Sequence, residues 1–484
     1  MKLNELLSDF SQASPPPLEI RSLTDNTANA NADSLLVCIH GVRFNGHDLA
    51  HRAYENGCRA FVCSEPVTLP PDAYILTVED TRHALSLLAC RFYGFPARSM
   101  KLIGITGTKG KTTVASLLSD VLTRAGIPCG YIGTNGACYQ DVHIPLKNTT
   151  PDPLTLQRLL FDMREGGIRT VVMEISSQAV YQSRIAGMTF DTCVFTNLYS
   201  DHVGPTEHPT FEHYKACKHR LFTDFSCRTM ISNADDPHAE EMQKSTTASH
   251  IVRFSMHDPK AVLYAYNVLP ILTEKGYGIS FCITENEKMH TVSLPLLGRF
   301  NASNALAVIA TARECFGLSL EGTAKLLRDA TVTGRTEAIK LKSGAYAVID
   351  YAHNGASLSA VLKALREYKP RRLICLFGSV GERSFLRRRE LGHAAATLSD
   401  LAILTSDNPG EEDPMAIISE IAREFEGTKT PYLAIPDRAE AIRRAVALTQ
   451  EGDILLLAGK GHENYQLIGK EKIPFSERAL LDEN

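Results

Sequence analysis

Short apolar runs separated by polar turns recur along the chain and predict a protein of the α/β class. In the first hundred residues they predict a small α/β unit that ends near Phe95-Pro96. Next, an apolar strand leads into a glycine-rich turn and a helical pattern over 113–125. Later apolar runs follow helical stretches, which is typical of a parallel sheet with crossover helices. The strands expected in these regions cover 34–39, 60–63, 73–78, 100–106, 170–173 and 191–196.

The second half of the chain divides in the same way. Residues 250–295 have the pattern of β-hairpins, and 303–315 that of a helix. From Gly334 onward, apolar runs at 347–350, 373–378, 401–405 and 453–458 alternate with amphipathic helices, the pattern of a doubly wound, Rossmann-like fold. We therefore expect three α/β domains: a small one over 1–98, a central one with a mainly parallel sheet over 99–333, and a C-terminal Rossmann-like one over 334–484.

Composition limits the classes of function. The chain has 484 residues, 44% hydrophobic and 22% charged, which suits several domains with buried cores and excludes a disordered chain. A net charge of -4 argues against a nucleic acid partner. Glu5 and Asp9 interrupt the apolar core that a signal peptide needs, and the apolar runs are too short to cross a bilayer. Twelve scattered cysteines without Cys-x-x-Cys spacing predict reduced, mostly buried thiols. We expect a cytoplasmic protein without membrane insertion; the oligomeric state stays open, and a monomer is compatible with the sequence.

A phosphate-binding loop is the first candidate site. The turn after the strand at 100–106 reads Gly107-Thr108-Lys109-Gly110-Lys111-Thr112-Thr113. Glycines allow successive backbone N–H groups to face one anion, and the following helix adds its positive N-terminal dipole. Lys111 is expected to reach the β- and γ-phosphates, and the Thr112 hydroxyl to bind Mg²⁺. A turn that only joins strand to helix is the alternative, but the flanking pattern favours a P-loop-type domain that binds ATP or another nucleoside triphosphate.

An acidic partner for the metal is expected at the end of a neighbouring strand. Glu174 ends the apolar run at 170–173 and is followed by Ser176 and Ser177. The alternative is a solvated glutamate at a strand end. The apolar residues before Glu174 and the serines after it favour the role of a Mg²⁺ ligand.

Eight motifs occur in the order of one family. They are Gly107–Thr113, Asn148-Thr149-Thr150-Pro151, Glu174-Ile175-Ser176-Ser177, Phe195–Leu198 with Asp201-His202, Gly298–Leu306, Asp350–His353, Asp407-Asn408-Pro409 and Gly459–Glu463. With these motifs the chain resembles the Mur ligases over nearly its whole length, and within them the members that add the third amino acid of the peptidoglycan stem.

The resemblance implies an ATP-dependent amide ligase. ATP would phosphorylate the γ-carboxylate of D-Glu in UDP-N-acetylmuramoyl-L-Ala-D-Glu, and the amine of a diamino acid would attack the acyl phosphate. The small-molecule partners are then this nucleotide-sugar dipeptide, a diamino acid and ATP, with Mg²⁺. Because several anionic groups must meet, Mg²⁺, Lys111 and arginines would have to offset their repulsion.

The resemblance also assigns roles to single residues. Lys111 and Thr112 would serve ATP and metal, Glu174 a first Mg²⁺ and His202 a second. Lys218 matches a lysine that is carbamylated in this family, and a carbamate, unlike an ammonium, can hold Mg²⁺; the alternative is an exposed helix lysine. Asn301 and Asn304 would contact the adenine side, and Arg335 and Asp350 the phosphates and ribose. Thr149, Thr150, Ser176, Gln182 and Arg184 would hold the muramoyl dipeptide, although Thr149 to Asp152 also fits a helix N-cap.

The choice of diamino acid stays open. Asp407, Asn408, Gly459, Glu463 and Arg388 match positions that bind the amino acid in enzymes using meso-diaminopimelate. In those enzymes an arginine follows Asp-Asn-Pro, because a guanidinium pairs with the second carboxylate. Here that residue is Gly410, which favours L-lysine or L-ornithine. Glu463 fits either amino acid, and Arg388 belongs to an arginine run that also suits a solvated helix face.

The chain departs from the family pattern in places, and rival functions remain. Asp25-Asn26-Thr27 stands where the family has Asp-Ser-Arg beside the uridine diphosphate, and Lys109 and Gln178 replace the usual Asn and His. The nearest rival is another Mur or folylpolyglutamate-type ligase. A P-loop ATPase or kinase is the next, and a non-catalytic nucleotide-binding scaffold is disfavoured because the candidate ligands are intact.

Overall fold

Parallel strands form the cores of three sheets in the computed structural model, which describes residues 1–10, 15–41, 44–200, 203–204, 207–273, 276–381 and 385–483. Every apolar run that the sequence predicts as a strand is one, and each of these strands has a parallel neighbour. The α/β class and the mainly parallel sheets are thereby confirmed. The chain forms two compact units, Met1–Arg253 and Phe254–Asn484, and the predicted division into three domains stays a prediction.

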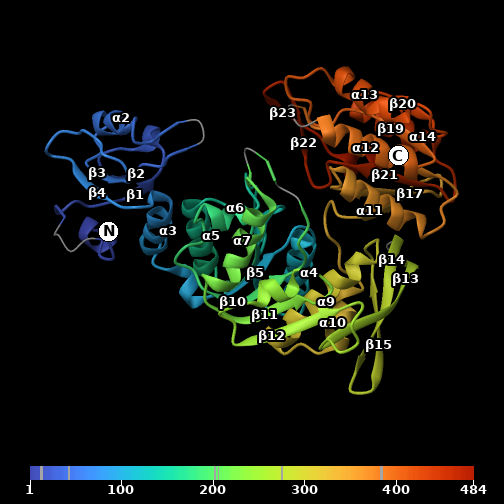
Figure 1. Cartoon of the computed structure of the whole chain (residues 1–484), viewed down its shortest axis with the longest axis horizontal. Coiled ribbons are helices and arrows are strands. Elements are labelled where there is room, and N and C mark those ends of the chain that lie inside the picture. The colour runs from blue at the N-terminus through green and yellow to red at the C-terminus, as the bar shows by residue number, and fades with distance from the viewer. Residues whose placement is uncertain are drawn as a thin grey trace. The chain divides into compact units, whose positions relative to one another are not determined.

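The N-terminal part of the first unit, blue in Figure 1, has a four-stranded parallel sheet in the order β1-β2-β3-β4. Val37 and Val62 pair in its centre, and the strands are apolar because helices cover them. Asp80 caps helix α3, and its carboxylate accepts from the N–H groups of Arg82 and His83. The elements are α1 (Leu3–Leu6), β1 (Ser22–Thr24), β2 (Ser34–Val37), α2 (Ala50–Glu55), β3 (Ala60–Cys63), β4 (Tyr74–Thr77) and α3 (Thr81–Phe92).

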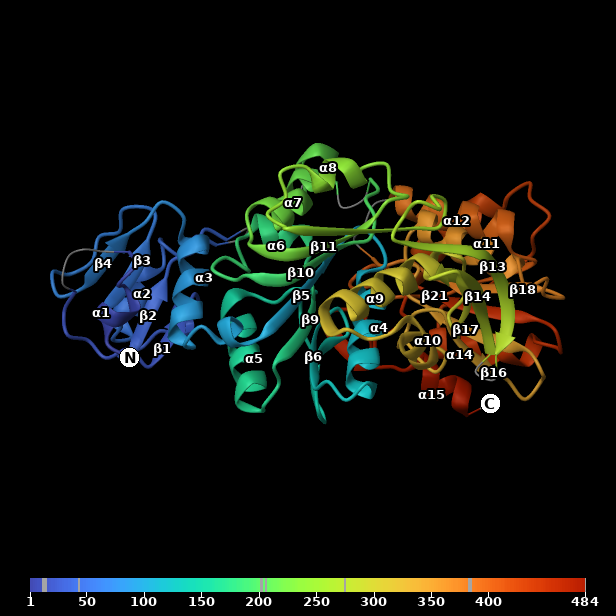
Figure 2. The same ribbon diagram turned by 90° about the horizontal axis from the view of Figure 1, so that it is seen from below.

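The rest of the first unit holds a sheet in the order β12-β11-β10-β5-β9-β6-β7-β8. Figure 2 shows β11, β10, β5, β9 and β6 side by side. β5, β9 and β10 are parallel, so their carboxyl ends lie at one edge. The elements are β5 (Lys101–Thr106), α4 (Lys111–Arg124), β6 (Cys129–Gly133), β7 (Gly136–Tyr139), β8 (Val142–Ile144), α5 (Pro153–Glu165), β9 (Thr170–Glu174), α6 (Ser177–Tyr181), β10 (Phe190–Phe195), α7 (Phe211–Thr223), β11 (Cys227–Asn233), α8 (Ala239–Gln243) and β12 (His250–Ser255).

Two details of this sheet differ from the sequence prediction. Helix α4 begins at Lys111, two residues before the predicted start, because Gly110 takes a positive φ of 86° and ends the turn there. The sequence does not predict the extension β6-β7-β8: β7 and β8 are short and only partly buried, and β6, although buried, contains two glycines.

The second unit includes the antiparallel hairpins β13-β14-β15 and helix α9. The prediction of hairpins over 250–295 is right for these strands and wrong for 250–255, where β12 runs parallel to β13. Its six-stranded sheet has the order β16-β17-β21-β18-β19-β20, in which only the short edge strand β16 is antiparallel. The elements are β13 (Leu263–Thr273), β14 (Gly276–Glu285), β15 (Lys288–Leu294), α9 (Phe300–Phe316), α10 (Leu320–Leu327), β16 (Glu337–Lys340), β17 (Tyr346–Asp350), α11 (Gly355–Arg366), β18 (Leu373–Phe377), α12 (Phe385–Leu398), β19 (Leu401–Leu404), α13 (Pro414–Ala422), β20 (Tyr432–Ala434), α14 (Arg438–Leu448), β21 (Ile454–Ala458), β22 (Tyr465–Ile468), β23 (Glu471–Pro474) and α15 (Glu477–Asp482).

The twelve cysteines are free, and nine of them are buried, as the sequence predicts. None of the helices in the described parts of the chain has the length and apolar character needed to cross a membrane.

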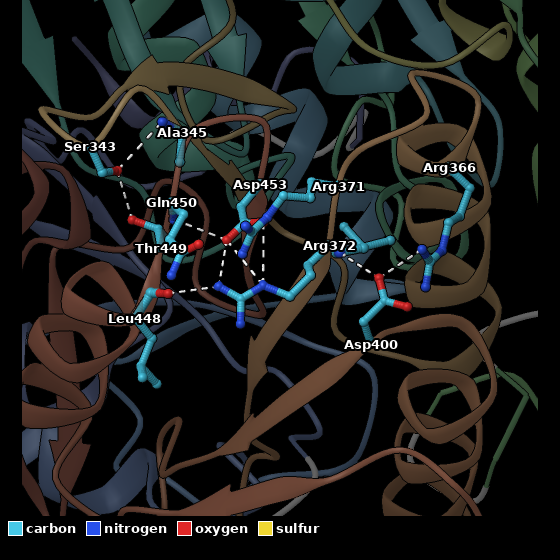
Figure 3. A network of polar contacts seen from close by, with 11 residues as sticks. Ser343, Ala345, Arg366, Arg371, Arg372, Asp400, Leu448, Thr449, Gln450 and Asp453 are labelled. Atoms are coloured by element: carbon cyan, nitrogen blue, oxygen red, sulfur yellow. Dashed lines mark hydrogen bonds and ion pairs between the residues drawn. The ribbon is translucent and has the colours of Figure 1, made fainter.

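A buried carboxylate holds the starts of two neighbouring strands in the six-stranded sheet. Asp453, just before β21, accepts from Arg371 at 3.1 Å, from Arg372 at 2.6 Å and from the N–H of Gln450 at 2.9 Å (Figure 3). Burial raises the pKa of Asp453, but the hydrogen bonds from Arg372, Gln450 and Arg371 outweigh it and hold the pKa below its usual value. The charged form of Asp453 therefore stabilises the register of β18 and β21.

Replacing Asp453 by Asn should lower the free energy of unfolding by about 2 kcal/mol near neutral pH, because a buried charged acceptor is lost. A depressed folded-state pKa contributes stability above the unfolded value of about 3.9, and this contribution disappears as the pH falls through the folded pKa. Urea unfolding should therefore show the difference between wild type and Asp453→Asn shrinking below about pH 4. Asp482→Asn, in an exposed pair with Arg478, is the control and should change stability by less than ~0.5 kcal/mol. An equal loss at all pH values would contradict this assignment.

Candidate active site

The phosphate loop is held by the residues that follow β10. Thr108 N–H donates to the Asn197 carbonyl at 2.9 Å, and Lys109 N–H donates to Asn197 Oδ1 at 2.8 Å. A Cβ on Gly107 would lie 1.9 Å from Thr196 Oγ1, so only glycine fits there. The backbone of the loop is thus fixed before a nucleotide arrives.

Lys111 begins α4 and its side chain turns back over the loop. Its Nζ donates to the carbonyls of Gly107 at 2.8 Å and Thr108 at 3.1 Å. This places the ammonium beside the concave backbone that would receive phosphate oxygens. The role of Lys111 at the phosphates stays a prediction.

Glu174 is a fully buried carboxylate at the end of β9. It accepts from Thr112 Oγ1 at 2.9 Å, Tyr131 OH at 2.7 Å, Thr134 N–H at 2.8 Å and Thr134 Oγ1 at 3.2 Å. Burial, followed by the charge and the hydrogen bond of Glu174, raises the pKa of Tyr131 well above its usual value. The solvated alternative for Glu174 is therefore wrong. Tyr131 and Thr134 were missed, because their role depends on the antiparallel turn between β6 and β7.

The five residues predicted to hold the muramoyl dipeptide lie together beside Glu174. Thr150 Oγ1 donates to the Glu174 carbonyl at 2.8 Å and accepts from the N–H of Ser176 at 3.0 Å. Arg184 donates to the Thr150 carbonyl at 2.7 Å and to Gln182 Oε1 at 2.7 Å. The hydroxyl oxygens of Thr149 and Thr134 are 3.1 Å apart. The N-cap alternative for this segment belongs to Asp152, which caps α5.

The surroundings of Arg184 are charged on two sides. Burial lowers the pKa of Arg184, while the charge of Asp152 raises it and that of Arg82 lowers it. Burial and the charge of Asp152 raise the pKa of Asp25, which belongs to the stretch expected beside the uridine diphosphate. The charges of Asp25, which follows β1, and of Arg82, on α3, thus lie close enough to interact with Asp152 and Arg184.

Lys218 lies on α7 and is 1% exposed. Its Nζ donates to the carbonyl of Gly107 at 2.8 Å and lies 4.6 Å from the centre of the Tyr214 ring. The alternative of an exposed helix lysine is therefore wrong for Lys218; Lys215, on the same helix, instead pairs with Glu212 and Glu241. His202 lies outside the described residues.

In the second unit, folding brings Arg335 and Asp350 close to one another. Asp350 ends β17 and its Oδ2 accepts from the N–H of Thr336 at 2.9 Å. The Arg335 guanidinium lies 4.9 Å from the centre of the Tyr351 ring. A Cβ on Gly334 would lie 2.2 Å from the backbone N of His462, so this turn packs directly on the loop after β21.

His462 was not singled out in the sequence. Burial, then the charges of Arg335 and Lys460, lower its pKa to about 4, so the ring is neutral at physiological pH.

Asn301 and Asn304, on α9, are buried and joined by a hydrogen bond. Asn304 Nδ2 donates to Asn301 Oδ1 at 2.8 Å, and Asn301 Nδ2 donates to the Leu297 carbonyl at 2.7 Å. Their predicted contact with adenine stays a prediction.

The residues expected to bind the amino acid gather around Lys460, which the sequence analysis did not single out. Lys460 is fully buried and donates to Asn408 Oδ1 at 3.0 Å and to Glu463 Oε2 at 2.9 Å. Asp407 Oδ1 lies 3.6 Å from the Lys460 ammonium and has no hydrogen-bond partner among the described residues. Gly459 has a φ of 113°, and a Cβ there would lie 2.8 Å from Asp407 Oδ2. Two carboxylates thus face one buried cation, so negative charge is in excess around Lys460.

Arg388 and Gly410 take structural positions. Arg388 is 2% exposed and binds Glu412 at 2.6 Å and Glu420 at 2.7 Å, so the solvated-face alternative for it is wrong. Gly410 has a φ of 61°; its N–H donates to the Leu467 carbonyl at 3.1 Å, and its own carbonyl accepts from Gly469 at 2.7 Å. Any ligand carboxylate would have to compete with Glu412 and Glu420 for Arg388.

Comparison with known proteins agrees with this geometry. The family model of the Mur ligase middle domain matches residues 105–312, and that of the Mur ligase glutamate ligase domain matches residues 334–461. A protein of Caldanaerobacter subterraneus subsp. tengcongensis, named UDP-N-acetylmuramoyl-L-alanyl-D-glutamate--2,6-diaminopimelate ligase, is 35% identical over 97% of this chain and 95% of its own. The chain belongs to the Mur ligase family. A Mur ligase of the same name from Lactiplantibacillus plantarum is 33% identical over 99% of this chain and 97% of its own.

Solved structures agree with the assignment. A structure with the same name as these relatives covers 100% of this Mur ligase and 98% of its own chain, with a TM-score of 0.72 and 27% identity. A folylpolyglutamate synthase of Mycobacterium tuberculosis shares the fold, with a TM-score of 0.62 over 78% of this Mur ligase and 92% of its own chain, at 17% identity.

Replacing Thr112 by Ala should weaken binding of ATP in the presence of Mg²⁺ by about tenfold or more, because one oxygen next to Glu174 is removed. Binding of ATP with Mg²⁺ chelated should stay within about twofold of wild type, a difference of ~0.4 kcal/mol. Calorimetric titration with and without Mg²⁺ measures both values. Thr123→Ala, at the exposed end of α4, is the matched control and should change neither. An equal weakening with and without Mg²⁺ would argue against a metal role for Thr112.

Proposed function

We propose that this Mur ligase joins a diamino acid to the γ-carboxylate of D-Glu in UDP-N-acetylmuramoyl-L-Ala-D-Glu, at the expense of ATP. One observation carries the proposal: Glu174 binds Thr112 of the phosphate loop through its carboxylate and Thr150 through its backbone carbonyl. Thr150 in turn bonds Ser176 and Arg184, Arg184 bonds Gln182, and Thr149 lies beside Thr134. A phosphate site and a polar substrate site thus meet at one residue. The names of full-length relatives at 33–36% identity support the same reaction.

The reaction needs two transfers. A carboxylate oxygen of D-Glu attacks the γ-phosphorus of ATP, and ADP leaves with the bridging oxygen. The neutral amine of the diamino acid then attacks the acyl carbon, loses a proton, and expels inorganic phosphate as the amide forms. Lys111, at the loop, is placed to offset the charge of the phosphoryl group, and Arg184 to orient the substrate.

The oxygen atoms of Thr112 and Glu174 are suitable ligands for Mg²⁺. Both Thr112 Oγ1 and the Glu174 carboxylate are hard oxygen ligands, which Mg²⁺ prefers. They are 2.9 Å apart, and neighbouring oxygens around an octahedral Mg²⁺ at about 2.1 Å stand about 3 Å apart. When bound, Mg²⁺ neutralises phosphate charge. We assign Thr112 and Glu174 to one ion, and His202 and Lys218 to a second.

Carbamylation of Lys218 follows from the same proposal. The Lys218 amine is buried against the Gly107 carbonyl, at the loop that receives the phosphates. Addition of CO₂ to the neutral amine, with loss of one proton, forms an N–C bond and a carbamate. This replaces a buried cation by an anion able to hold Mg²⁺.

The second unit is assigned to nucleotide and amino acid. Arg335 and Asp350 would serve the phosphates and ribose, and Asn301 and Asn304 the adenine side. The pair Asp407 and Glu463 suits an ammonium group of the amino acid, because Lys460 is their only cationic partner among the described residues. Reaction in the cytoplasm, where ATP and nucleotide sugars are available, completes the proposal.

For the amino acid we propose 2,6-diaminopimelate, on the strength of the names of the relatives. L-Lysine is the second candidate, and two observations favour it. Gly410 offers no cation to a second carboxylate, and Arg388 is held by Glu412 and Glu420.

The first test is phosphate release by the full chain with ATP, Mg²⁺ and UDP-N-acetylmuramoyl-L-Ala-D-Glu. Meso-diaminopimelate, L-lysine and L-ornithine are offered in separate reactions, and the product is identified by mass. We expect release only when both the dipeptide and an amino acid are present, with diaminopimelate preferred. Release without the dipeptide would favour an ATPase, and release with none of the amino acids another ligase.

Changing Gly410 to Arg should raise the ratio of kcat/KM for diaminopimelate over lysine by about tenfold, because a guanidinium can pair with the second carboxylate. The φ of 61° at this position makes any side chain costly, by about 1–2 kcal/mol. Gly410→Ala is therefore the matched control: it carries the same backbone strain without the charge and should leave the ratio unchanged. An unchanged ratio in Gly410→Arg would sink this account of selectivity.

A further inference from the structure

Two histidines and a cysteine meet at helix α7, apart from the groups assigned to nucleotide, Mg²⁺ and substrate. His213 and Cys217 lie one turn apart on the helix, so they share a face. His208 precedes the helix and is fully buried. The Nδ1 atoms of His208 and His213 are 2.8 Å apart, and Cys217 Sγ lies 3.8 Å from His213 Nδ1. The three possible ligand atoms all lie within 4.8 Å of one another.

Two of these separations, His208–His213 and His213–Cys217, are close to those around a tetrahedral ion. With bonds of about 2.05 Å to nitrogen and about 2.3 Å to sulfur, neighbouring nitrogens stand about 3.3 Å apart and nitrogen and sulfur about 3.6 Å apart. The pairs His208–His213 and His213–Cys217 are within about 0.5 Å of these values, a difference that small side-chain rotations can supply. We propose that His208, His213 and Cys217 form a binding site for one soft divalent transition-metal ion of the Zn²⁺ class.

The surroundings orient the ligands. The Nε2 atom of His208 lies 2.8 Å from Ser177 Oγ, and histidines that bind metals usually donate their second N–H to such a partner. In that tautomer, Nδ1 of His208 presents its lone pair toward His213. Thr210 caps α7 by accepting from the N–H of His213 at 3.1 Å, which fixes the first turn. The edge of the Tyr181 ring packs on His213 with centroids 4.9 Å apart.

The ligand chemistry distinguishes this site from the Mg²⁺ site. Imidazole and thiolate prefer Zn²⁺ and its neighbours over Mg²⁺, which prefers oxygen. On binding, the Cys217 thiol releases its proton to solvent and a sulfur–metal bond forms, without any change of oxidation state. The three side chains leave a fourth position for water.

The site is joined to the phosphate loop through the same helix. Tyr214 OH donates to Thr108 Oγ1 at 3.1 Å, and Lys218 Nζ donates to the Gly107 carbonyl at 2.8 Å. An ion bound to His208 and to α7 would therefore hold the segment around His208 against α7, the helix that carries Lys218.

The test is a titration of the metal-free full chain with Co²⁺, without nucleotide or substrate. We expect one Co²⁺ per chain, with the visible bands of a tetrahedral site and a thiolate-to-cobalt charge-transfer band. Zn²⁺ should displace the Co²⁺, and excess Mg²⁺ should not. Cys217→Ala should lose the charge-transfer band, and His213→Ala should bind Co²⁺ at least about tenfold more weakly.

Cys138→Ala is the matched control. Cys138 is a free, partly buried thiol, and His143 is its cross-strand neighbour. This variant should keep the charge-transfer band, and Zn²⁺ should raise the melting temperature of wild type and Cys138→Ala but not of Cys217→Ala. Cys217→Ser replaces Cys217→Ala if the latter does not fold. The proposal is overturned if wild type shows no thiolate band, if Cys217→Ala keeps it, or if Cys138→Ala loses it. No turnover is measured, so the outcome is independent of the proposed ligase reaction.

Discussion

The buried carboxylate of Glu174 is the interaction on which the active site of the first unit depends. It ends a central strand and accepts hydrogen bonds from the helix after the phosphate loop, from Tyr131 on β6 and from the turn at Thr134. A fully buried anion is tolerated only when donors surround it, so these elements are fixed relative to one another. The backbone carbonyl of Glu174 also accepts from Thr150, which joins the substrate residues to the same point. The phosphate loop, the turn at Thr134 and the segment at Thr150 are thus joined through one residue.

A second constraint is the close contact between two loops at a glycine. Gly107 leaves no space for a Cβ beside Thr196, and Gly334 none beside the backbone of His462. At both places two loops pack against one another with glycine at the contact. Such contacts stiffen loops that follow strands, where catalytic residues must be held to within fractions of an ångström. As a result, no residue with a side chain fits at either position.

Charge is arranged differently in the two units. In the first, Lys111 and Lys218 both direct their ammonium groups to the carbonyl of Gly107. In the second, Lys460 lies among Asn408, Glu463 and Asp407, where acidic groups outnumber the buried cation. The ammonium of Lys111 suits anionic phosphates, and the acidic groups around Lys460 suit an amino acid's ammonium. The same distribution explains why a near-neutral chain with no bulk positive charge can bind a strongly anionic nucleotide.

The sequence by itself determined the fold class, the strands at the centres of the sheets and the glycine-rich loop, because apolar periodicity and glycine spacing are local signals. It also identified Glu174, which ends an apolar run, whereas Thr150 and Arg184 followed only from the resemblance to the Mur ligases. Tertiary structure alone decided that Glu174 is surrounded by Tyr131 and Thr134, that Lys460 is buried between Asp407 and Glu463, and that His208, His213 and Cys217 meet. These contacts join residues brought together by turns, antiparallel edges and packing between loops, which no single window of sequence encodes. Gly410 shows the same limit. The sequence shows only that the arginine is missing. The structure shows that Gly410 has a positive φ and that its N–H and its carbonyl are both hydrogen-bonded to the hairpin at 467–469.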